Sequence, residues 1–177
     1  MKRLNVGCGP CVAPGWMNAD RQDTEGIDFP CDIRAGLPVE SDSFDYIVGI
    51  HMLQDVPYPD VLPVLSELRR VLKPHGVLRL GLPDLDKAMD AYVQGDHAYF
   101  YVRDDDAATI GSKLVTQLVW YGSVRTPFTY DFIEEWLRKA GYREVNRCAF
   151  KHTHSVYPGI VQLDNRERES LFVEATK

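Results

Sequence analysis

The sequence predicts an α/β fold built on a mostly parallel sheet, and three observations predict it. Residues 4–9 form a short apolar segment that runs directly into a Gly-x-Gly pair. Residues 44–50 are nearly continuously apolar, which is typical of a strand buried on both faces of a parallel sheet. A helical apolar pattern at 61–72 and another apolar run at 77–82 follow. Together these last three segments form a β-α-β unit, whose crossover should be right-handed.

Composition and charge restrict the class of protein. With 177 residues, of which 45% are hydrophobic and 26% charged, the chain is the size of one domain with a real core, and we expect a single domain over 1–177. No run approaches the roughly 20 apolar residues of a membrane span, and the N-terminus does not resemble a signal peptide. We therefore expect a soluble, cytoplasmic protein. The net charge of −6 argues against general nucleic-acid binding.

The four cysteines are too few and too scattered for a secreted disulfide framework, so we expect reduced thiols. Cys8 and Cys11 do match the Cys-x-x-Cys redox motif, in which the first thiolate attacks and the second resolves. That motif normally follows a β-α unit and opens a long helix, whereas here a Pro-Gly loop follows Cys11. A thiol redox protein is therefore a remote alternative.

The glycine loop at Gly7, Cys8 and Gly9 is interpreted as the floor of a nucleotide pocket, because glycine lets a ligand lie directly against the backbone. Two prolines and a glycine follow it and leave no room for a full helix, so the first crossover must be abbreviated. A second strand then ends at Asp20, eleven positions after Gly9. Asp20 is a candidate acceptor for two ribose hydroxyls; the alternative is a turn aspartate.

Two further strand ends carry candidate binding residues. Asp32 and Ile33 offer an acceptor beside an apolar flank, which suits an adenine amino group and ring; the alternative is that Asp32 only caps a turn. The strand at 44–50 ends at Ile50 and His51. These two residues therefore lie at the carboxyl edge of the sheet, where open α/β sheets bind their ligands.

The segment 83–125 contains two helical patterns and many aromatic residues. It is interpreted as a substrate-side helical insertion whose aromatic side chains line an acceptor pocket or a dimer surface; an ordinary packed helix pair is the alternative. The acidic run at 104–106 is interpreted as helix capping rather than a metal site. His152 and His154 lack a third ligand nearby, so no metal site is predicted. Thr129 begins the last predicted helix, and strands at 145–150 and 171–175 complete the sheet.

This series of segments resembles class I S-adenosylmethionine-dependent methyltransferases. The resemblance rests on the strand and glycine loop at 4–10, on Asp20, on Cys31-Asp32-Ile33, on the strand at 44–48, and on the Leu-Lys-Pro-x-Gly turn within 68–77. The Gly-Cys-Gly loop followed by a Trp-x-Asn-x-Asp strand is similar to the compact, type-11-like subgroup. The resemblance to this family implies a Rossmann-like three-layer sandwich with a seven-stranded, mostly parallel sheet, strand order 3-2-1-4-5-7-6 and an antiparallel last strand.

The resemblance also implies an activity: methyl transfer from S-adenosylmethionine, with S-adenosylhomocysteine as product, to a small-molecule acceptor whose identity stays open. The expected cofactor-binding residues are Asn5, Gly7, Cys8, Gly9, Asp20, Asp32, Ile33, Ile50 and His51. The chain departs from the family pattern at three places. Asn5 replaces a usual acidic residue, Cys11 a frequent third glycine, and Gln54-Asp55 a common Glu-His pair.

A general base is required only if the acceptor is a hydroxyl or a protonated amine. The candidates are His51, then Asp84, then Asp55. An unperturbed histidine pKa of about 6.5 would let His51 accept a proton near neutral pH. The alternative for His51 is a structural role at a strand end. Capping helices are not expected before the first strand, so a second copy of the chain or a partner subunit is a candidate for covering the pocket. A non-catalytic cofactor-binding regulatory or partner subunit is therefore the alternative function.

Overall fold

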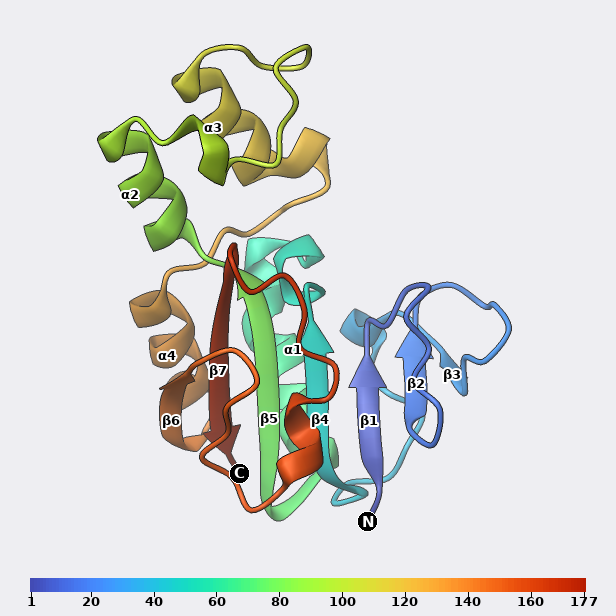
Figure 1. Ribbon diagram of the computed structural model, residues 1–177. Coiled ribbons are helices and arrows are strands. Elements are labelled where there is room, and N and C mark those ends of the chain that lie inside the picture. The colour runs from blue at the N-terminus through green and yellow to red at the C-terminus, as the bar shows by residue number, and fades with distance from the viewer.

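Figure 1 shows the computed structural model, which describes residues 1–177 as seven strands in one sheet with helices packed on it. The strand order is β3-β2-β1-β4-β5-β7-β6, and β7 pairs antiparallel with both of its neighbours. The α/β class, the order and the antiparallel strand are therefore confirmed. The strands are β1 (Arg3–Val6), β2 (Met17–Asp20), β3 (Phe29–Pro30), β4 (Phe44–Ile50), β5 (Leu72–Pro83), β6 (Arg143–Cys148) and β7 (Ser170–Thr176). The helices are α1 (Tyr58–Val71), α2 (Leu85–Gln94), α3 (Ile110–Val119) and α4 (Tyr130–Lys139), with short 3-10 turns η1 (Ile33–Ala35), η2 (Leu53–Asp55), η3 (His97–Tyr99), η4 (Trp120–Gly122) and η5 (Pro158–Val161).

The connection from β1 to β2 contains no helix, which confirms the abbreviated first crossover. Two buried amides hold it instead. Asn5 Nδ2 donates to the Cys11 carbonyl and to Asn18 Oδ1, at 3.0 Å each. Asn18 Oδ1 also accepts from the Ala13 N–H at 2.9 Å. Side-chain amides thus supply the partners that the backbone of a helix would otherwise find within itself.

Helices α1 and α4 cover one face of the sheet and enclose the main core. In α1 the buried residues recur every three or four positions, at Val61, Val64, Leu65, Leu68 and Val71, so one stripe faces the strands. In α4 the Thr129 hydroxyl accepts from Phe132 N–H as the N-cap, as the sequence predicts, and Ile133 and Leu137 are fully buried. Apolar periodicity therefore predicts this face correctly.

The opposite face is covered by the segment 149–169, which is mostly coil around η5 (Figure 1). Ile160 from this segment packs with Val48 and with Tyr46, whose ring also makes an edge-to-face contact with Trp16 at 5.3 Å. The third layer of the sandwich is thus formed largely without helices. Apolar periodicity cannot identify such a layer, because its contacts come from single side chains of an irregular segment.

Arg79 on β5 anchors this covering segment through a buried ion network. Its side chain is fully buried, and Nε and Nη2 donate to the two oxygens of Asp164 at 2.7 and 2.6 Å. Nη1 donates to Glu174 Oε1 at 2.7 Å and to the His152 carbonyl at 3.0 Å, and Nη2 also donates to Ala149 O at 3.3 Å. All five N–H groups of the guanidinium therefore have partners.

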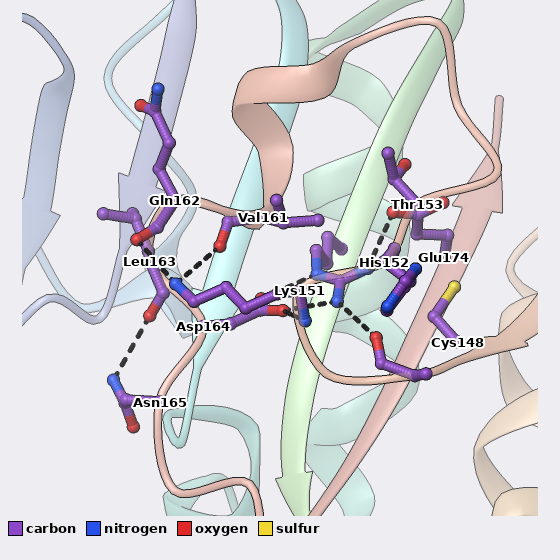
Figure 2. Close-up of polar contacts among 12 residues, drawn as sticks. Cys148, Lys151, His152, Thr153, Val161, Gln162, Leu163, Asp164, Asn165 and Glu174 are labelled. Carbon is purple, nitrogen blue, oxygen red and sulfur yellow. Dashed lines mark hydrogen bonds and ion pairs between the residues drawn. The ribbon is translucent and has the colours of Figure 1, made fainter.

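The carboxylates of this network also accept backbone N–H groups from the covering segment. Asp164 Oδ2 accepts from Lys151 N–H at 2.8 Å, and Glu174 Oε2 accepts from His154 N–H at 2.9 Å. Lys151 Nζ also links two parts of the covering segment by donating to the carbonyls of Val161 and Gln162 (Figure 2). A buried charge is tolerated only when it is paired and hydrogen-bonded, and both conditions are met here.

The segment between β5 and α4 holds α2 and α3 beyond the carboxyl ends of the parallel strands (Figure 1). The acidic run does not cap α3: Thr109 is the N-cap, and Asp104 instead pairs with the buried ammonium of Lys113 at 2.7 Å. The capping interpretation of 104–106 is therefore wrong, because the helix begins several residues later. None of the helices combines the length and the apolar character that a membrane-spanning segment requires.

Replacing Arg79 with methionine should lower the free energy of unfolding by about 3–5 kcal/mol, because Asp164 and Glu174 would stay buried without their cation. Urea denaturation measures this loss. The matched control is Arg138→Met, which breaks an exposed ion pair with Glu134 and should change stability by no more than about 0.5 kcal/mol. Equal effects of the two substitutions would contradict the anchoring role of Arg79.

Candidate functional site

A cavity of about 680 Å³ lies at the carboxyl ends of β1, β2 and β4. This size is within the range of about 300–1,000 Å³ that small-molecule sites occupy. The structure brings all nine expected cofactor-binding residues to its wall: Asn5, Gly7, Cys8, Gly9, Asp20, Asp32, Ile33, Ile50 and His51. They come from four separate segments, which meet because parallel strands end at the same edge of the sheet.

The glycine loop is shaped by two left-handed glycines with different surroundings. Gly7 has φ +63°, and a Cβ there would lie 2.3 Å from Met52 Cβ, so no side chain fits. Gly9 has φ +51°, but a Cβ there would meet nothing within 4 Å. Gly7 is thus required by packing, whereas Gly9 leaves bare backbone on the wall of the cavity.

Asp20 ties the loop to β2. Its Oδ2 accepts from the Gly9 N–H at 2.8 Å, and its Oδ1 accepts from the Gln22 N–H at 2.9 Å. A carboxylate has about four acceptor positions, so each oxygen retains capacity for a ligand hydroxyl. The turn-aspartate interpretation and the ribose interpretation are therefore compatible at this residue.

Asn5 and Asp32 line the cavity but are already engaged by the protein. Both N–H groups of the Asn5 amide are used in the β1–β2 connection. Asp32 caps η1 and accepts from Arg34 Nη2 at 2.5 Å, and this hydrogen bond lowers the pKa of Asp32 to about 2. Asp32 therefore does cap a turn, and an adenine amino group would share this carboxylate with Arg34.

Cys8 is buried under the same loop, and desolvation together with the charge of Asp20 raises the pKa of its thiol to about 11. A thiol with such a pKa stays protonated near neutral pH and is a poor nucleophile. This geometry disfavours the redox alternative for Cys8 and Cys11.

A second cavity of about 280 Å³ adjoins the first. Its walls come from the end of β5, from α2 and η3, from the end of α3 and η4, and from the covering segment 149–169. The lining residues are His51, Gln54, Asp55, Pro83, Asp84, Leu85, Ala88, Tyr99, Gln117, Leu118, Trp120, Ser123, Val124, Pro127, Arg166 and Glu169. Three of these residues, His51, Asp55 and Arg166, also line the larger cavity. They mark the junction at which two ligands would meet.

His51 is held at this junction in a left-handed backbone conformation with φ +53°. Its Nε2 lies 2.7 Å from Ser170 Oγ, and that hydroxyl donates its single hydrogen to the Arg166 carbonyl at 2.8 Å. Nε2 must therefore carry a hydrogen and donate it to Ser170, so in the neutral ring Nδ1 holds the lone pair. Burial, with a smaller effect from Arg166, lowers the pKa of His51 from 6.5 to about 4. The unperturbed pKa expected from sequence is thus wrong for this residue.

The two other candidate bases, Asp84 and Asp55, differ in burial and in how far the protein already uses their carboxylates. Asp84 is buried, its Oδ1 caps α2 by accepting two backbone N–H groups, and its Oδ2 accepts from Arg147 Nη2 at 3.1 Å. Asp55 is exposed toward the cavities, and desolvation in the cleft raises its pKa. Asp84 therefore has a structural task that Asp55 lacks.

Sequence reasoning missed the polar residues that the covering segment contributes. Arg166 and Glu169 reach the second cavity from the loop before β7, and Asn165 reaches the larger one. Only a run of charged residues marks this loop in the sequence, and such runs are usually solvated. Sequence reasoning also missed the N-cap role of Asp84, although an aspartate directly before an apolar helical pattern is a typical N-cap signal.

The two glycines of the loop give a prediction on stability. Gly7→Ala should cost about 2–5 kcal/mol, because it combines left-handed strain with a clash against Met52. Gly9→Ala is the matched control and should cost only the strain of about 1–2 kcal/mol, since its Cβ enters open space. Urea denaturation of both variants checks the difference; a greater loss for Gly9→Ala would show that the loop packs differently.

The lowered pKa of His51 predicts a pH dependence of stability. The unfolded chain takes up a proton at a pKa near 6.5 and the folded chain only near 4, so this group's contribution is complete above pH 6.5 and is lost as the pH falls toward 4. The wild type should therefore lose up to about 3 kcal/mol across this window that His51→Asn does not lose. Asparagine suits the test because it tolerates the left-handed backbone. Parallel pH profiles of unfolding for the two proteins would refute the shift.

The chain is similar to known methyltransferases both in part of its sequence and in its fold. Residues 12–80 match the family model described as methyltransferase domain. A search of curated protein sequences gives no match. Among solved structures, a Thermotoga maritima SAM-dependent methyltransferase, described as a possible histamine N-methyltransferase, is 18% identical, with a TM-score of 0.62 over 99% of this chain and 82% of that one.

Two further solved structures are similar over 99% of this chain. One is a SAM-dependent methyltransferase from Archaeoglobus fulgidus, 12% identical and covered over 86% of its length, with a TM-score of 0.59. The other is a complex between the Haloferax volcanii Trm112 methyltransferase activator and a methyltransferase, 15% identical over 81% of that chain, with a TM-score of 0.54. The similarity to these solved structures over nearly the whole chain shows that the protein has the fold of S-adenosylmethionine-dependent methyltransferases, and the methyltransferase-domain model matches its residues 12–80.

Proposed function

We propose that the protein transfers a methyl group from S-adenosylmethionine to a small-molecule acceptor. The observation that carries this proposal is the pair of adjoining cavities that share His51, Asp55 and Arg166. Group transfer between two ligands requires two sites that meet at the reacting atoms, and the wall they share marks that place. The methyltransferase-domain match favours the larger cavity as the cofactor site.

The residues of the larger cavity fit this cofactor. Gly9 leaves space against the backbone, Asp20 retains acceptor positions for ribose hydroxyls, and Ile33 offers an apolar surface beside Asp32. When bound, S-adenosylmethionine supplies a methyl group that is electrophilic because it is attached to a sulfonium. Such chemistry needs no metal, and the task of the protein is to hold the acceptor in line with that methyl group.

Different residues of the chain would bind the acceptor, orient it and, where needed, remove its proton. The segment 83–125 supplies most of the second cavity, so we propose that residues 1–177 act as one methyltransferase unit with this segment on the substrate side. His51, with its neutral ring, orients the acceptor through Nδ1 rather than acting as a strong base. If a proton has to be removed, Asp55 is the better candidate than Asp84, because its raised pKa lies closer to neutrality and its carboxylate is not a helix cap.

A non-catalytic cofactor-binding subunit is the alternative function. The second cavity favours the enzyme, because a purely cofactor-binding protein has no need of an acceptor site beside the cofactor. One similar solved structure is a complex of a methyltransferase with its activator. For this chain, a partner or a second copy that covers the cavities stays a prediction.

Cofactor binding gives the direct test. Calorimetric titration with S-adenosylhomocysteine should show binding to the wild type, and Asp20→Asn should weaken it about 10- to 150-fold, because a charge-assisted contact worth about 1.5–3 kcal/mol is lost. Asp23→Asn is the matched control, since Asp23 is exposed in the same loop and does not line the cavity. Absence of binding by the wild type would overturn the proposed function, and an equal effect of both variants would overturn the role of Asp20.

A further inference from the structure

The second cavity is rich in hydrogen-bond acceptors and negative charge. Its wall holds the carboxylates of Asp55, Asp84 and Glu169 but a single guanidinium, that of Arg166. His51 adds no positive charge near neutral pH, because burial keeps its ring neutral. Asp84 is compensated by Arg147 from outside the cavity. The wall itself thus carries three carboxylates against one guanidinium, and the charges of Asp55 and Glu169 are partly offset by arginines that do not line this cavity, namely Arg21, Arg125 and Arg168.

Glu169 is the most informative of these groups. It is only 9% exposed, yet its carboxylate accepts no hydrogen bond from the protein. The nearest cation is Arg166, whose Nη1 lies 3.6 Å from Oε1 and whose own side chain is 55% exposed. That separation exceeds a hydrogen bond. Its oxygens are not fully enclosed by the protein, so this carboxylate faces the cavity with hydrogen-bond capacity left for a ligand.

Gln54, which lines the same cavity, also has an acceptor atom without a hydrogen-bond partner. It is only 6% exposed, and its Nε2 donates to the His51 carbonyl at 2.5 Å. Its Oε1 is buried and has no hydrogen-bond partner. Exchanging the amide nitrogen and oxygen would not remove the problem, because Oε1 would then face the His51 carbonyl. These two side chains therefore have free acceptor positions, and the hydrogen bond to the His51 carbonyl uses one of the two N–H groups of the Gln54 amide.

The rest of the wall combines apolar and aromatic side chains with the polar side chains of Gln117 and Ser123. Tyr99 and Trp120 contribute rings, and Leu85, Leu118 and Val124 contribute aliphatic surface. A ligand that fits both parts of the wall carries a positively charged donor at one end and an apolar body at the other.

We propose that this cavity binds the methyl acceptor as a protonated amine with an apolar body, whose N–H groups donate to Glu169 and Gln54. Before transfer the ammonium gives one proton to Asp55 on the same wall, and the nitrogen lone pair then attacks the methyl carbon as the methyl–sulfur bond breaks. The identification of the ligand as the acceptor rests on the proposed function. An ammonium group carries the charge that the cavity lacks and has up to three donors, whereas an alcohol of the same shape has one donor and no charge. Burial raises the pKa of Glu169, against the opposing effects of Arg166 and Arg168.

The experiment compares two probes of nearly equal shape, 2-phenylethylamine and 2-phenylethanol, by calorimetric titration near pH 7. Each is titrated into the protein alone and into the protein saturated with S-adenosylhomocysteine. The amine should bind at least about tenfold more tightly than the alcohol, because it gains a charge-assisted hydrogen bond. The preference should be present in both states of the protein.

Two variants test whether Glu169 causes the preference for the amine over the alcohol. Glu169→Gln keeps the shape of the side chain but removes its charge, and it should reduce the preference for the amine to less than about threefold. Glu167→Gln is the matched control, because Glu167 lies exposed on the same loop and does not line the cavity; it should retain the wild-type preference. Urea denaturation and binding of S-adenosylhomocysteine show whether each variant is folded.

The outcomes separate this inference from the proposed function. Equal or weaker binding of the amine, no binding of the amine at millimolar concentration, or an unchanged preference in folded Glu169→Gln would each overturn the amine inference. Failure of S-adenosylhomocysteine to bind would instead overturn the proposed function, whatever the probes do. A preference for the amine that Glu169→Gln abolishes would support the inference.

Discussion

The buried pairing of Arg79 with Asp164 and Glu174 is the interaction on which both the second face of the sheet and the site depend. Arg79 and Glu174 belong to neighbouring strands, and Asp164 belongs to the covering segment, so one guanidinium joins strand to strand and strand to loop. The same segment continues two to five residues beyond Asp164 to Arg166 and Glu169, which line the cavities. A fixed cation inside the sheet thus helps to position the residues of the covering segment that line the second cavity.

The parallel sheet supplies the other half of the site. Gly7 must turn sharply beneath Met52, and this turn directs the Gly9 backbone toward the larger cavity. No helix follows the turn, so the amides of Asn5 and Asn18 hold the connection instead. The residue that departs from the family's acidic pattern therefore has a physical reason to be an amide: it donates two hydrogen bonds that a carboxylate could not donate.

Local sequence patterns predict much of this fold because they report local constraints. The apolar run that forms β4, the stripe of α1 and the Thr129 cap of α4 are each visible within about one element. All nine expected cofactor residues lie at one cavity for the same reason: each lies at or near the carboxyl end of a parallel strand. The patterns fail where a side chain's environment is set by distant residues.

His51 and Glu169 illustrate that limit. The position of His51 at a strand end follows from the sequence, but its lowered pKa depends on burial by segments far along the chain. Glu169 lies in a charged, irregular loop, which the Arg79 network and the packing of Ile160 hold over the sheet. Neither property has a periodic signature, so neither is predictable from sequence spacing alone.

The most direct measurement is a crystal structure of the protein grown with S-adenosylhomocysteine. The account predicts the nucleoside in the larger cavity, with its ribose hydroxyls on Asp20 and its sulfur directed toward the junction at His51, Asp55 and Arg166. The second cavity would then lie directly beyond the sulfur. A nucleoside bound elsewhere, or a sulfur directed away from that junction, would contradict the claim that the two cavities form one methyl-transfer site.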